Sequence, residues 1–382
     1  MDSTNTEENS ITLTNSLARI RQNIDLFNGR FPNSGDGHSY TLNDNVNWLA
    51  AFWPGMLWLA DANSDDTVYR ETAVSLLPTF STRLDTQVHI THDMGFLSSL
   101  SARAQWQETG DEVAQNLALR AADELVARYR LPGKYIQAWG PIGEERRGGL
   151  IIADTMMNLP LLFWASEQTG DPRYREAAYN HAQLSRQYLI REDGSSFHTY
   201  FFNQETGEPI EGRTHQGFGD DSCWARGHAW LIYGFALAAQ WCDEPEFLEA
   251  AKQTAVYFLN HLPEDNIPIW DFRLTDDEIA YRDSSAAAIA ACGLLRIAQL
   301  TGDDTFLAQG NMLTDALISE CFETDTAGQG LLKHGALHIP KGWTPDGYLI
   351  FGDYFFLEAL LTCENKNPDF WGPTNKTNNE RR

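Results

Sequence analysis

Two kinds of helical pattern alternate along the chain. In the first kind nearly every position is apolar, which is typical of a helix that is covered on all sides. In the second kind apolar residues recur every three or four positions, which predicts an amphipathic helix lying outside the first kind. The apolar pattern covers residues 48–60, 93–108, 154–169, 224–241, 284–300 and 352–363. The amphipathic pattern covers residues 11–27, 67–84, 111–130, 172–190, 244–262 and 305–320.

Three junctions between an apolar segment and the amphipathic segment after it share the sequence Thr-Gly-Asp, starting at Thr109, Thr169 and Thr301. Glycine readily adopts the positive φ that ends a helix, and aspartate is a favoured N-cap of the next one. The sequence therefore predicts helix hairpins with defined ends. Asp154, which precedes one of the apolar segments, also occupies a position typical of an N-cap.

About twelve helices in six such pairs predict an all-α fold, an (α/α)6 barrel whose apolar helices run parallel inside a ring of amphipathic helices. The N-termini of the inner helices and the long loops then share one rim, where we expect the active-site cleft. One domain is predicted over residues 11–365, between a disordered tail at residues 1–10 and a C-terminal tail at residues 366–382. A short pair of strands is expected near residues 197–202, in the long Gly-rich loop.

The charge balance restricts the partners of the protein. The 28 Lys and Arg residues against 53 Asp and Glu residues give a formal net charge of −25, whereas nucleic acids and anionic membranes bind basic surfaces. We therefore expect neither as a partner, and no apolar run approaches the roughly 18 residues that predict a membrane span. An anionic substrate would need a local basic pocket. The 12 Trp, 13 Tyr and 20 Phe residues are enough to fill a core and also line a sugar-binding surface.

No metal or cofactor is predicted. The five cysteines lack Cys-x-x-Cys spacing, which indicates reduced thiols and not a disulfide framework or zinc site. The histidines show no metal-ligand spacing, and no phosphate-loop or dinucleotide motif is present. Residues 1–10 lack the apolar core of a signal peptide, so we expect a cytoplasmic protein, or a periplasmic one if a leader was removed. A monomer or weak homodimer is expected.

Two carboxylates, Asp93 and Asp154, stand at the starts of apolar helices. An aspartate at such a position is most often an N-cap, so local sequence does not separate a catalytic role from a structural one. The same is true of four further residues: Asp44, Asp221, Asp283 and Asp353. A barrel that gathers carboxylates at one rim nevertheless suits glycosidic chemistry, which commonly uses a proton donor and a partner carboxylate. Burial among tryptophans would raise the pKa of such a donor.

Basic residues and histidines near the predicted rim are candidates for binding. Arg226 lies in an otherwise apolar helix, so its charge is expected to meet either an inner aspartate or a substrate carboxylate. Lys341 is a loop cation, for which a surface position is the alternative. His198 and His228 lie at loop or helix-start positions, where a hydrogen-bonded structural histidine is the alternative.

Eight short motifs resemble, in their order along residues 43–360, the unsaturated glucuronyl hydrolases of glycoside hydrolase family 88. Each motif alone is modest, but the shared order is highly specific. The motifs are Leu42-Asn43-Asp44-Asn45, His92-Asp93-Met94-Gly95-Phe96, Gln137-Ala138-Trp139-Gly140-Pro141, Asp154-Thr155-Met156-Met157-Asn158-Leu159-Pro160, Thr214-His215-Gln216-Gly217, Trp224-Ala225-Arg226-Gly227-His228-Ala229-Trp230, Tyr281-Arg282-Asp283-Ser284-Ser285-Ala286 and Gly352-Asp353-Tyr354-Phe355-Phe356-Leu357-Glu358-Ala359-Leu360. The resemblance implies an α/α six-barrel, in agreement with the helix pattern.

The resemblance also implies a substrate, a small anionic oligosaccharide left by polysaccharide lyases with a 4,5-unsaturated uronic acid at its non-reducing end. The family cleaves the bond indirectly, by hydrating a vinyl ether. By motif, Asp154 would protonate C4 and activate the water that adds at C5 as the nucleophile. The hemiketal so formed would rearrange and release the unsaturated sugar as an open keto acid. Asp93 would be the second essential carboxylate.

The same matching implies the residues of the binding site. Three tryptophans would form the walls of the first sugar subsite: Trp48, Trp139 and Trp230. Three polar residues would contact its hydroxyls, its carboxylate or the reacting water: His198, Gln216 and Arg226. Arg226 would also supply the local positive charge that an anionic substrate needs. Residues 337–341 correspond to a region that can read sulfate on the next sugar, and Lys341 fits that role although no serine accompanies it. At His228 the family often has Gln, so no role is assigned to it.

Three alternatives remain open. The unsaturated rhamnogalacturonyl hydrolases share the barrel and the chemistry but act on another second sugar. A sugar epimerase on an α/α barrel would use histidines as acid and base, here His198 and His228, and would stay active after Asp154→Asn. A non-catalytic oligosaccharide-binding protein would bind the sugars and convert none of them.

Overall fold

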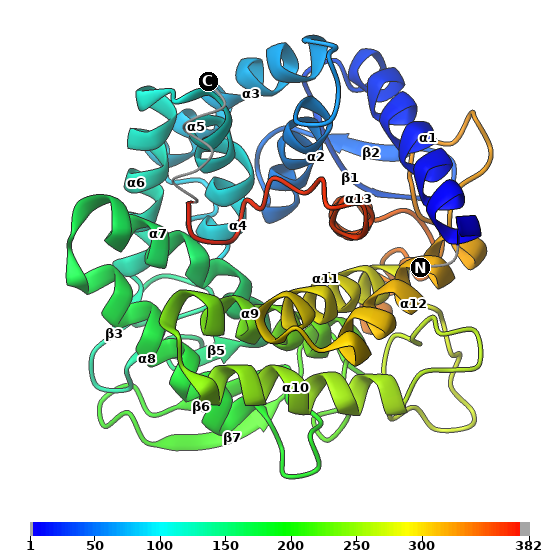
Figure 1. The fold of residues 1–382 in the computed structure, drawn as a ribbon. Coiled ribbons are helices and arrows are strands. Elements are labelled where there is room, and N and C mark those ends of the chain that lie inside the picture. Colours follow the sequence, from blue (N-terminus) through cyan, green and yellow to red (C-terminus); the bar gives the residue numbers. More distant parts are fainter. Residues whose placement is uncertain (1–2, 375–382) are drawn as a thin grey trace.

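The computed structural model describes residues 3–374 and confirms the predicted (α/α)6 barrel (Figure 1). Six inner helical segments form a ring in which each packs against the next, and the last closes on the first. The inner segments are α2 (Phe52–Asp61), α4 with α5 (Met94–Ser98 and Ala104–Thr109), α7 (Leu159–Thr169), α9 (Ala225–Cys242), α11 (Ser284–Thr301) and α13 (Ile350–Cys363). The outer helices are α1 (Ser3–Phe27), α3 (Val68–Asp85), α6 (Glu112–Val126), α8 (Pro172–Leu189), α10 (Pro245–Asn260) and α12 (Asp304–Glu320).

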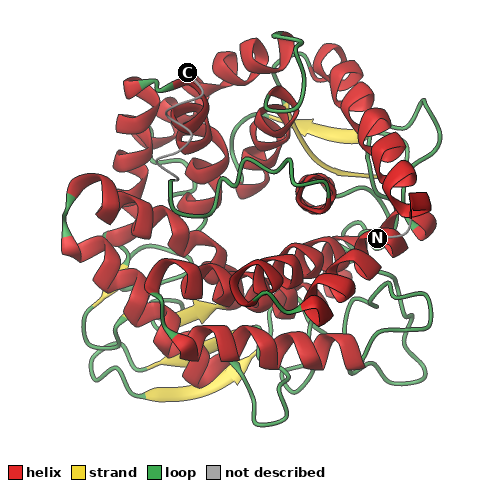
Figure 2. Ribbon diagram, in the orientation of Figure 1, coloured by secondary structure: helices red, strands yellow, loops and turns green. Residues whose placement is uncertain are grey.

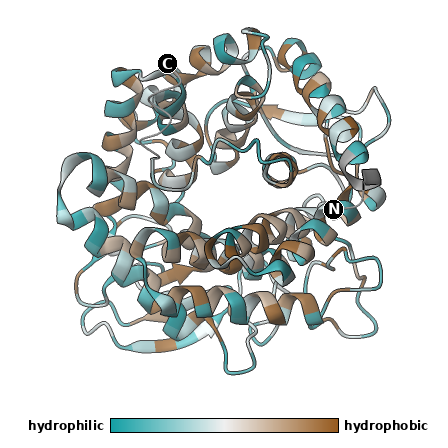
Figure 3. Ribbon diagram, in the orientation of Figure 1, coloured by the Kyte–Doolittle hydropathy of each residue, from teal (hydrophilic) through white to brown (hydrophobic). Residues whose placement is uncertain are grey.

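The difference in hydrophobic pattern decides which helices are inside. Nearly every residue of α9 and α11 is buried, whereas α8 and α10 bury only one side. Figure 3 shows the same contrast, with brown inner helices and mixed outer ones. By length and composition α11 is apolar enough to cross a membrane, but 83% of it is buried inside the barrel. Its apolar composition is therefore that of a core helix. All five cysteines are unpaired, and four of them are buried.

The three Thr-Gly-Asp junctions end and begin helices as predicted. The glycines at 110, 170 and 302 have φ values of 73°, 74° and 68° and end α5, α7 and α11. The aspartates at 111, 171 and 303 cap α6, α8 and α12 by accepting a backbone N–H two residues on. A side chain at these glycine positions would be strained by the left-handed backbone.

Strands are confined to the loops between outer and inner helices (Figure 2). The pair expected near residues 197–202 is instead part of a three-stranded antiparallel sheet of β5 (Leu150–Ile152), β6 (Thr199–Phe202) and β7 (Pro209–Arg213). Two hairpins accompany it, β1 (Phe31–Gly35) with β2 (Tyr40–Asn43) and β3 (Tyr129–Arg130) with β4 (Tyr135–Ile136). The extra strand was not apparent because β5 is only three residues long and buried.

Both chain ends differ from the predicted tails. Helix α1 begins at Ser3, not at residue 11, because the polar residues before its apolar face include no Gly or Pro and can extend the helix into solvent. The predicted C-terminal tail packs on the barrel at its start, where Phe370 and Trp371 are buried. In Figure 1 this red segment crosses the middle of the ring. Residues 1–2 and 375–382 of the two tails lie outside the described residues.

Candidate active site

A pocket of about 660 Å³ opens at the end of the barrel where the inner helices begin. Six of the predicted site residues line it: Trp48, Asp93, Trp139, Asp154, Gln216 and Lys341. Three others lie behind its surface: His198, Arg226 and Trp230. The four further candidate aspartates, at 44, 221, 283 and 353, do not line the pocket. The barrel therefore brings Asp93 and Asp154 to one cavity although 60 residues separate them in the chain.

The two carboxylates are brought together by one asparagine and one glycine. The side chain of Asn158 donates to the carbonyl of Asp154 (3.0 Å) and accepts the backbone N–H of Phe96 (2.7 Å). The two chain segments approach so closely at Gly95 that an added Cβ would lie 2.3 Å from the Cα of Asn158. Any larger residue at Gly95 would therefore push the two carboxylates apart.

Asp154 lies in a 3-10 turn, Ala153–Asn158, and does not cap a helix. The predicted N-cap is wrong because this turn separates Asp154 from the start of α7 and leaves its side chain facing the pocket. Its Oδ2 is 3.5 Å from Nε2 of His198, and neither atom has a hydrogen-bond partner among the described residues. Nδ1 of His198 accepts the backbone N–H groups of His215 and Gln216. Nε2 of His198 therefore carries the proton and directs it at the carboxylate.

Asp93 has different neighbours. Its Oδ2 accepts a hydrogen bond from Thr91 (3.0 Å), and its Oδ1 lies 3.4 Å from Nε2 of His92. Nδ1 of His92 is in turn 3.0 Å from the hydroxyl of Thr155, the residue that follows Asp154. His92 therefore connects Asp93 to the segment that carries Asp154, through the hydroxyl of Thr155.

The two carboxyl groups have pKa values that move in opposite directions. Burial, together with the charge of Asp154, raises the pKa of Asp93 above its ordinary value. Burial alone would also raise the pKa of Asp154, but the N–H of His198 and the nearby charge of Arg226 outweigh it, so this pKa is lowered. The free protein therefore holds a proton more readily on Asp93 than on Asp154. Separated pKa values within one pocket are typical of acid–base catalysis.

Two of the three tryptophans predicted to form the walls of the pocket do so. Trp48 stacks on Phe351 with ring centroids 5.2 Å apart, and Trp139 stands 4.9 Å from the ring of His215. Trp230 does not line the pocket, because its side chain is fully buried beneath it against Phe96. A large apolar residue on a fully covered inner helix is drawn into the core in this way.

Arg226 forms an ion pair with an inner aspartate and is not exposed to solvent. Its guanidinium donates to Asp283 (2.6 Å) and to the backbone carbonyls of Ala336 and Leu337, and it is 1% exposed. The side chain of Gln216 binds the same Leu337 carbonyl (3.1 Å). Lys341 is therefore the one Lys or Arg that lines the pocket within the described chain. Arg226 influences the pocket through its charge and by holding the loop at residues 336–337.

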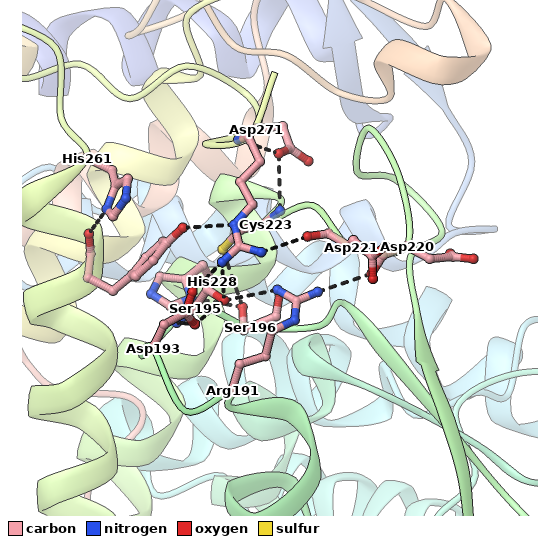
Figure 4. Close-up of polar contacts among 12 residues, drawn as sticks. Arg191, Asp193, Ser195, Ser196, Asp220, Asp221, Cys223, His228, His261 and Asp271 are labelled. Carbon is pink, nitrogen blue, oxygen red and sulfur yellow. Dashed lines mark hydrogen bonds and ion pairs between the residues drawn. The ribbon is translucent and has the colours of Figure 1, made fainter. Parts of the chain in front are cut away.

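The loop at residues 214–223, which carries Gln216, is held by a network of polar contacts, some buried and some exposed (Figure 4). Asp271 is fully buried and accepts one hydroxyl and two backbone N–H groups from this loop. Arg191 and Arg273 each donate to a backbone carbonyl of the loop. This network fixes Gln216 at the pocket edge, although Asp271, Arg191 and Arg273 do not line the pocket.

No individual role was predicted for two further residues that line the pocket, His338 and Trp343. His338 is 5% exposed, and neither of its ring nitrogens has a hydrogen-bond partner in residues 3–374. Burial lowers the pKa of His338 to about 4, so its ring is neutral at pH 7. Trp343 is 55% exposed, and Nζ of Lys341 lies 4.6 Å from its ring centroid. A signal was available in the sequence, because Trp343 lies in a loop between two helical patterns, where a large apolar side chain is not part of a helix face.

His228 is fully buried away from the pocket, where its ring contacts the hydroxyl of Ser196 and the carbonyl of Thr254. Burial lowers its pKa to about 4. An epimerase that uses His198 and His228 as acid and base does not fit this arrangement, because only His198 adjoins the pocket. Among the described residues no group of three or more His, Cys, Asp or Glu side chains is placed to hold a metal ion.

Comparison with known proteins gives the family. The model of Glycosyl Hydrolase Family 88 matches residues 23–353. The chain belongs to glycoside hydrolase family 88. Its family 88 relatives include the unsaturated glucuronyl hydrolase of Bacillus sp. (strain GL1), 47% identical over 93% of this chain and 96% of the relative. The unsaturated chondroitin disaccharide hydrolase of Streptococcus pyogenes serotype M1 is 40% identical over 93% of this chain and 91% of the relative.

Solved family 88 structures share the fold. The crystal structure of the unsaturated glucuronyl hydrolase from Bacillus sp. GL1 matches with a TM-score of 0.92 and 45% identity, over 94% of this chain and 98% of that one. An unsaturated glucuronyl hydrolase specific for heparin matches with a TM-score of 0.88 at 27% identity, over 94% of this chain and 97% of that one. The barrel is thus a family 88 barrel along nearly its whole length.

Proposed function

We propose that this protein is an unsaturated glucuronyl hydrolase, which removes a 4,5-unsaturated uronic acid from the non-reducing end of oligosaccharides made by polysaccharide lyases. The names of the family 88 relatives support this activity. The observation that carries it is the carboxylate of Asp154, which faces a tryptophan-walled pocket with one oxygen free of hydrogen bonds among the described residues. A buried acceptor without a partner is unusual and is typical of a group that awaits a substrate.

In the proposed reaction Asp154 donates a proton to C4 of the double bond, which leaves positive charge shared between C5 and the ring oxygen. A water molecule adds at C5 and gives its second proton to the carboxylate, which restores the acid. The hemiketal at C5 opens to a ketone, and the ring oxygen becomes a hydroxyl on C1. The hemiacetal at C1 then collapses, and the next sugar leaves with its oxygen. One water is consumed, and the glycosidic bond breaks without attack at C1.

Asp154 must be protonated before it can act as the acid in these reaction steps, so substrate binding has to add a proton to its carboxylate. Its pKa is lowered in the free protein, but the carboxylate of the substrate adds a like charge and excludes water, and both effects raise a carboxyl pKa. Asp93 is held by Thr91 and His92. As the second acid group of the pocket, it orients the sugar. Trp48 and Trp139 supply apolar faces for the ring.

The experiment is turnover of a panel of lyase-generated disaccharides from hyaluronan, chondroitin, heparin, gellan and ulvan, together with unsaturated galacturonyl-rhamnose. We expect loss of the ultraviolet absorbance of the conjugated double bond, with release of one reducing sugar per substrate and deuterium at C4 of the keto acid when the solvent is D₂O. Ordinary attack at C1 would release the sugar before the double bond is lost. An unchanged absorbance across the whole panel, or preferred turnover of unsaturated galacturonyl-rhamnose, would overturn the assignment.

A further inference from the structure

A second cavity, of about 560 Å³, adjoins the catalytic pocket. Trp139 and His215 line both cavities, and their ring centroids are 4.9 Å apart. The other lining residues of the two cavities differ. These two side chains therefore form the partition between the catalytic pocket and a separate hollow, which we call the side cavity.

One face of the three-stranded sheet forms the floor of the side cavity. Leu150 pairs with Phe201, and Thr199 pairs with Arg213, in the registers of β5, β6 and β7. Because Thr199 and Phe201 are two residues apart on one strand, their side chains and those of their partners lie on the same face, including Glu211, which pairs with Phe201. Leu150, Thr199, Phe201 and Arg213 line the side cavity. The floor thus combines an aromatic ring, a hydroxyl and a cation, which is the chemistry that binds a sugar carrying an acid group.

The charge of the side cavity is opposite to that of the protein. Arg147 and Arg213 line it, and no Asp or Glu of the described chain does, although the net charge is −25. Each arginine pairs with an acidic residue outside the lining, Glu144 or Glu211. Both arginine side chains are about half exposed. Exposed pairs of this kind are weak, so an incoming anion can share the guanidinium groups.

We propose that the side cavity is a second binding site, for an acidic sugar of one or two residues, distinct from the catalytic pocket and beyond the proposed hydrolase activity. Its volume is within the range of small-ligand pockets. Arg147 and Arg213 bind the carboxylate or sulfate group, Phe201 and Trp139 supply apolar faces, and the threonines accept and donate hydrogen bonds to the sugar hydroxyls.

A ligand bound in the side cavity affects the catalytic pocket through the residues that the two cavities share. Trp139 is also a wall of the first sugar subsite. Thr91 lines the side cavity and donates a hydrogen bond to Asp93 inside the catalytic pocket. A sugar in the side cavity therefore contacts the supports of both the tryptophan wall and the second carboxylate, and it should change turnover as well as apparent affinity.

The test uses D-glucuronate, a saturated acid that the proposed reaction cannot convert, with the full-length protein. Calorimetric titration is expected to show two bound molecules on the parent protein and one on the Arg147→Ala/Arg213→Ala double variant, with the second site weakened about tenfold or more. Arg146→Ala is the matched control, because Arg146 is the exposed neighbour of Arg147 and does not line the cavity. Glucose, which lacks the acid group, should not occupy the second site.

Inhibition of disaccharide turnover gives an independent readout. Glucuronate should lower both kcat and kcat/KM of the parent and of Arg146→Ala, but only kcat/KM of the double variant, with unchanged melting temperatures. One bound glucuronate on the parent, equal binding by the double variant, or equally strong competition by inorganic sulfate would overturn the proposal. The titration needs no turnover, so failure of the proposed hydrolase activity would be seen separately, as normal binding without reaction.

Discussion

Both ends of the barrel bury carboxylates among aromatic rings, but the two ends differ in the hydrogen bonds that these carboxylates accept. At the end where the inner helices finish, Glu358 is 1% exposed and accepts hydrogen bonds from Tyr233 and from Nε1 of Trp371. Arg296 is paired there with Asp369 at 2.7 Å. The C-terminal segment thus closes this end with hydrogen-bond partners for both buried carboxylates, Glu358 and Asp369.

At the open end, Asp154 keeps one oxygen without a hydrogen bond among the described residues, 3.5 Å from the equally unpaired Nε2 of His198. The contrast teaches that burial alone does not mark a catalytic carboxylate. Unused hydrogen-bonding capacity does, because leaving it unused costs stability that a purely structural residue would recover.

The largest effect on activity is expected for Asp154→Asn. We expect kcat to fall by about 10³-fold or more, since loss of a general acid or base costs roughly 10²–10⁴ in rate and this residue serves as both. Thermal stability at pH 7 should fall only slightly, because the lowered pKa shows that the fold stabilises the charged form, whereas Asn keeps the shape of the side chain. The measurement is turnover of the preferred disaccharide, with exposed Asp44→Asn as the control. A variant that keeps its rate would show that the free carboxylate is not the acid.

The closed end should respond in the opposite sense. Trp371→Ala removes a fully buried ring and one partner of Glu358, and we expect a loss of about 3–5 kcal/mol in the free energy of unfolding. The folded fraction should keep its kcat within about twofold, because Trp371 does not line the catalytic pocket. Urea titration and active-site-normalised turnover measure the two quantities. Selective loss of kcat with unchanged stability would contradict the division between the ends.

Asp353 is a structural carboxylate near the start of an inner helix, so it can be compared directly with Asp154. Burial raises its pKa to about 7, although the hydroxyl of Tyr40 and the N–H groups of Leu331 and Leu332 stabilise the charged form. A raised pKa in the folded state means that stability from this group is present below about pH 4, is lost as the pH rises toward 7 and is constant above that.

The Asp353→Asn variant lacks this pH-dependent contribution to stability. The variant should therefore be less stable than the parent at pH 4, and the difference in the free energy of unfolding should shrink up to about pH 7, by a few kcal/mol at most. Urea titrations at several pH values in this window give the difference. A deficit that grows with pH would mean that the carboxylate is ionised and well paired at pH 5, against the burial seen here.

The smallest effect is expected for Lys341→Ala. Lys341 is the one Lys or Arg lining the catalytic pocket in residues 3–374, and a cation at a solvated edge contributes about 1 kcal/mol or less, so kcat/KM should fall a few-fold. The decrease should appear mainly in KM and should disappear at high salt. Lys333→Ala, a cation outside the pocket, is the control. A salt-independent loss of kcat would assign Lys341 a part in the chemistry itself.

The fold could be predicted because its signals are local. Each Thr-Gly-Asp junction carries a helix end and a helix start within three residues, and the contrast between α9 and α10 is visible in composition alone. The choice of Asp93 and Asp154 among the six candidate aspartates came from the resemblance, since an aspartate at a helix start is equally typical of a cap.

What could not be predicted depends on contacts between distant residues. Arg226 had two possible anions, and only the fold shows that Asp283 reaches it first. Phe370 and Trp371 read as part of a tail because a short segment after the last helix has no periodicity. The side cavity joins residues from five separate stretches between 89 and 215, and no local pattern reveals that its lining contains no acid.

The parallel course of the inner helices has an electrostatic consequence. Six segments point their N-termini toward one opening, and the N-terminus of a helix resembles about half a positive charge at close range. A protein with 25 surplus negative charges would repel an acidic ligand from afar, yet the last few ångströms of the approach run along aligned backbone dipoles that attract it. The scaffold itself, and not only its basic side chains, therefore guides a uronate inward.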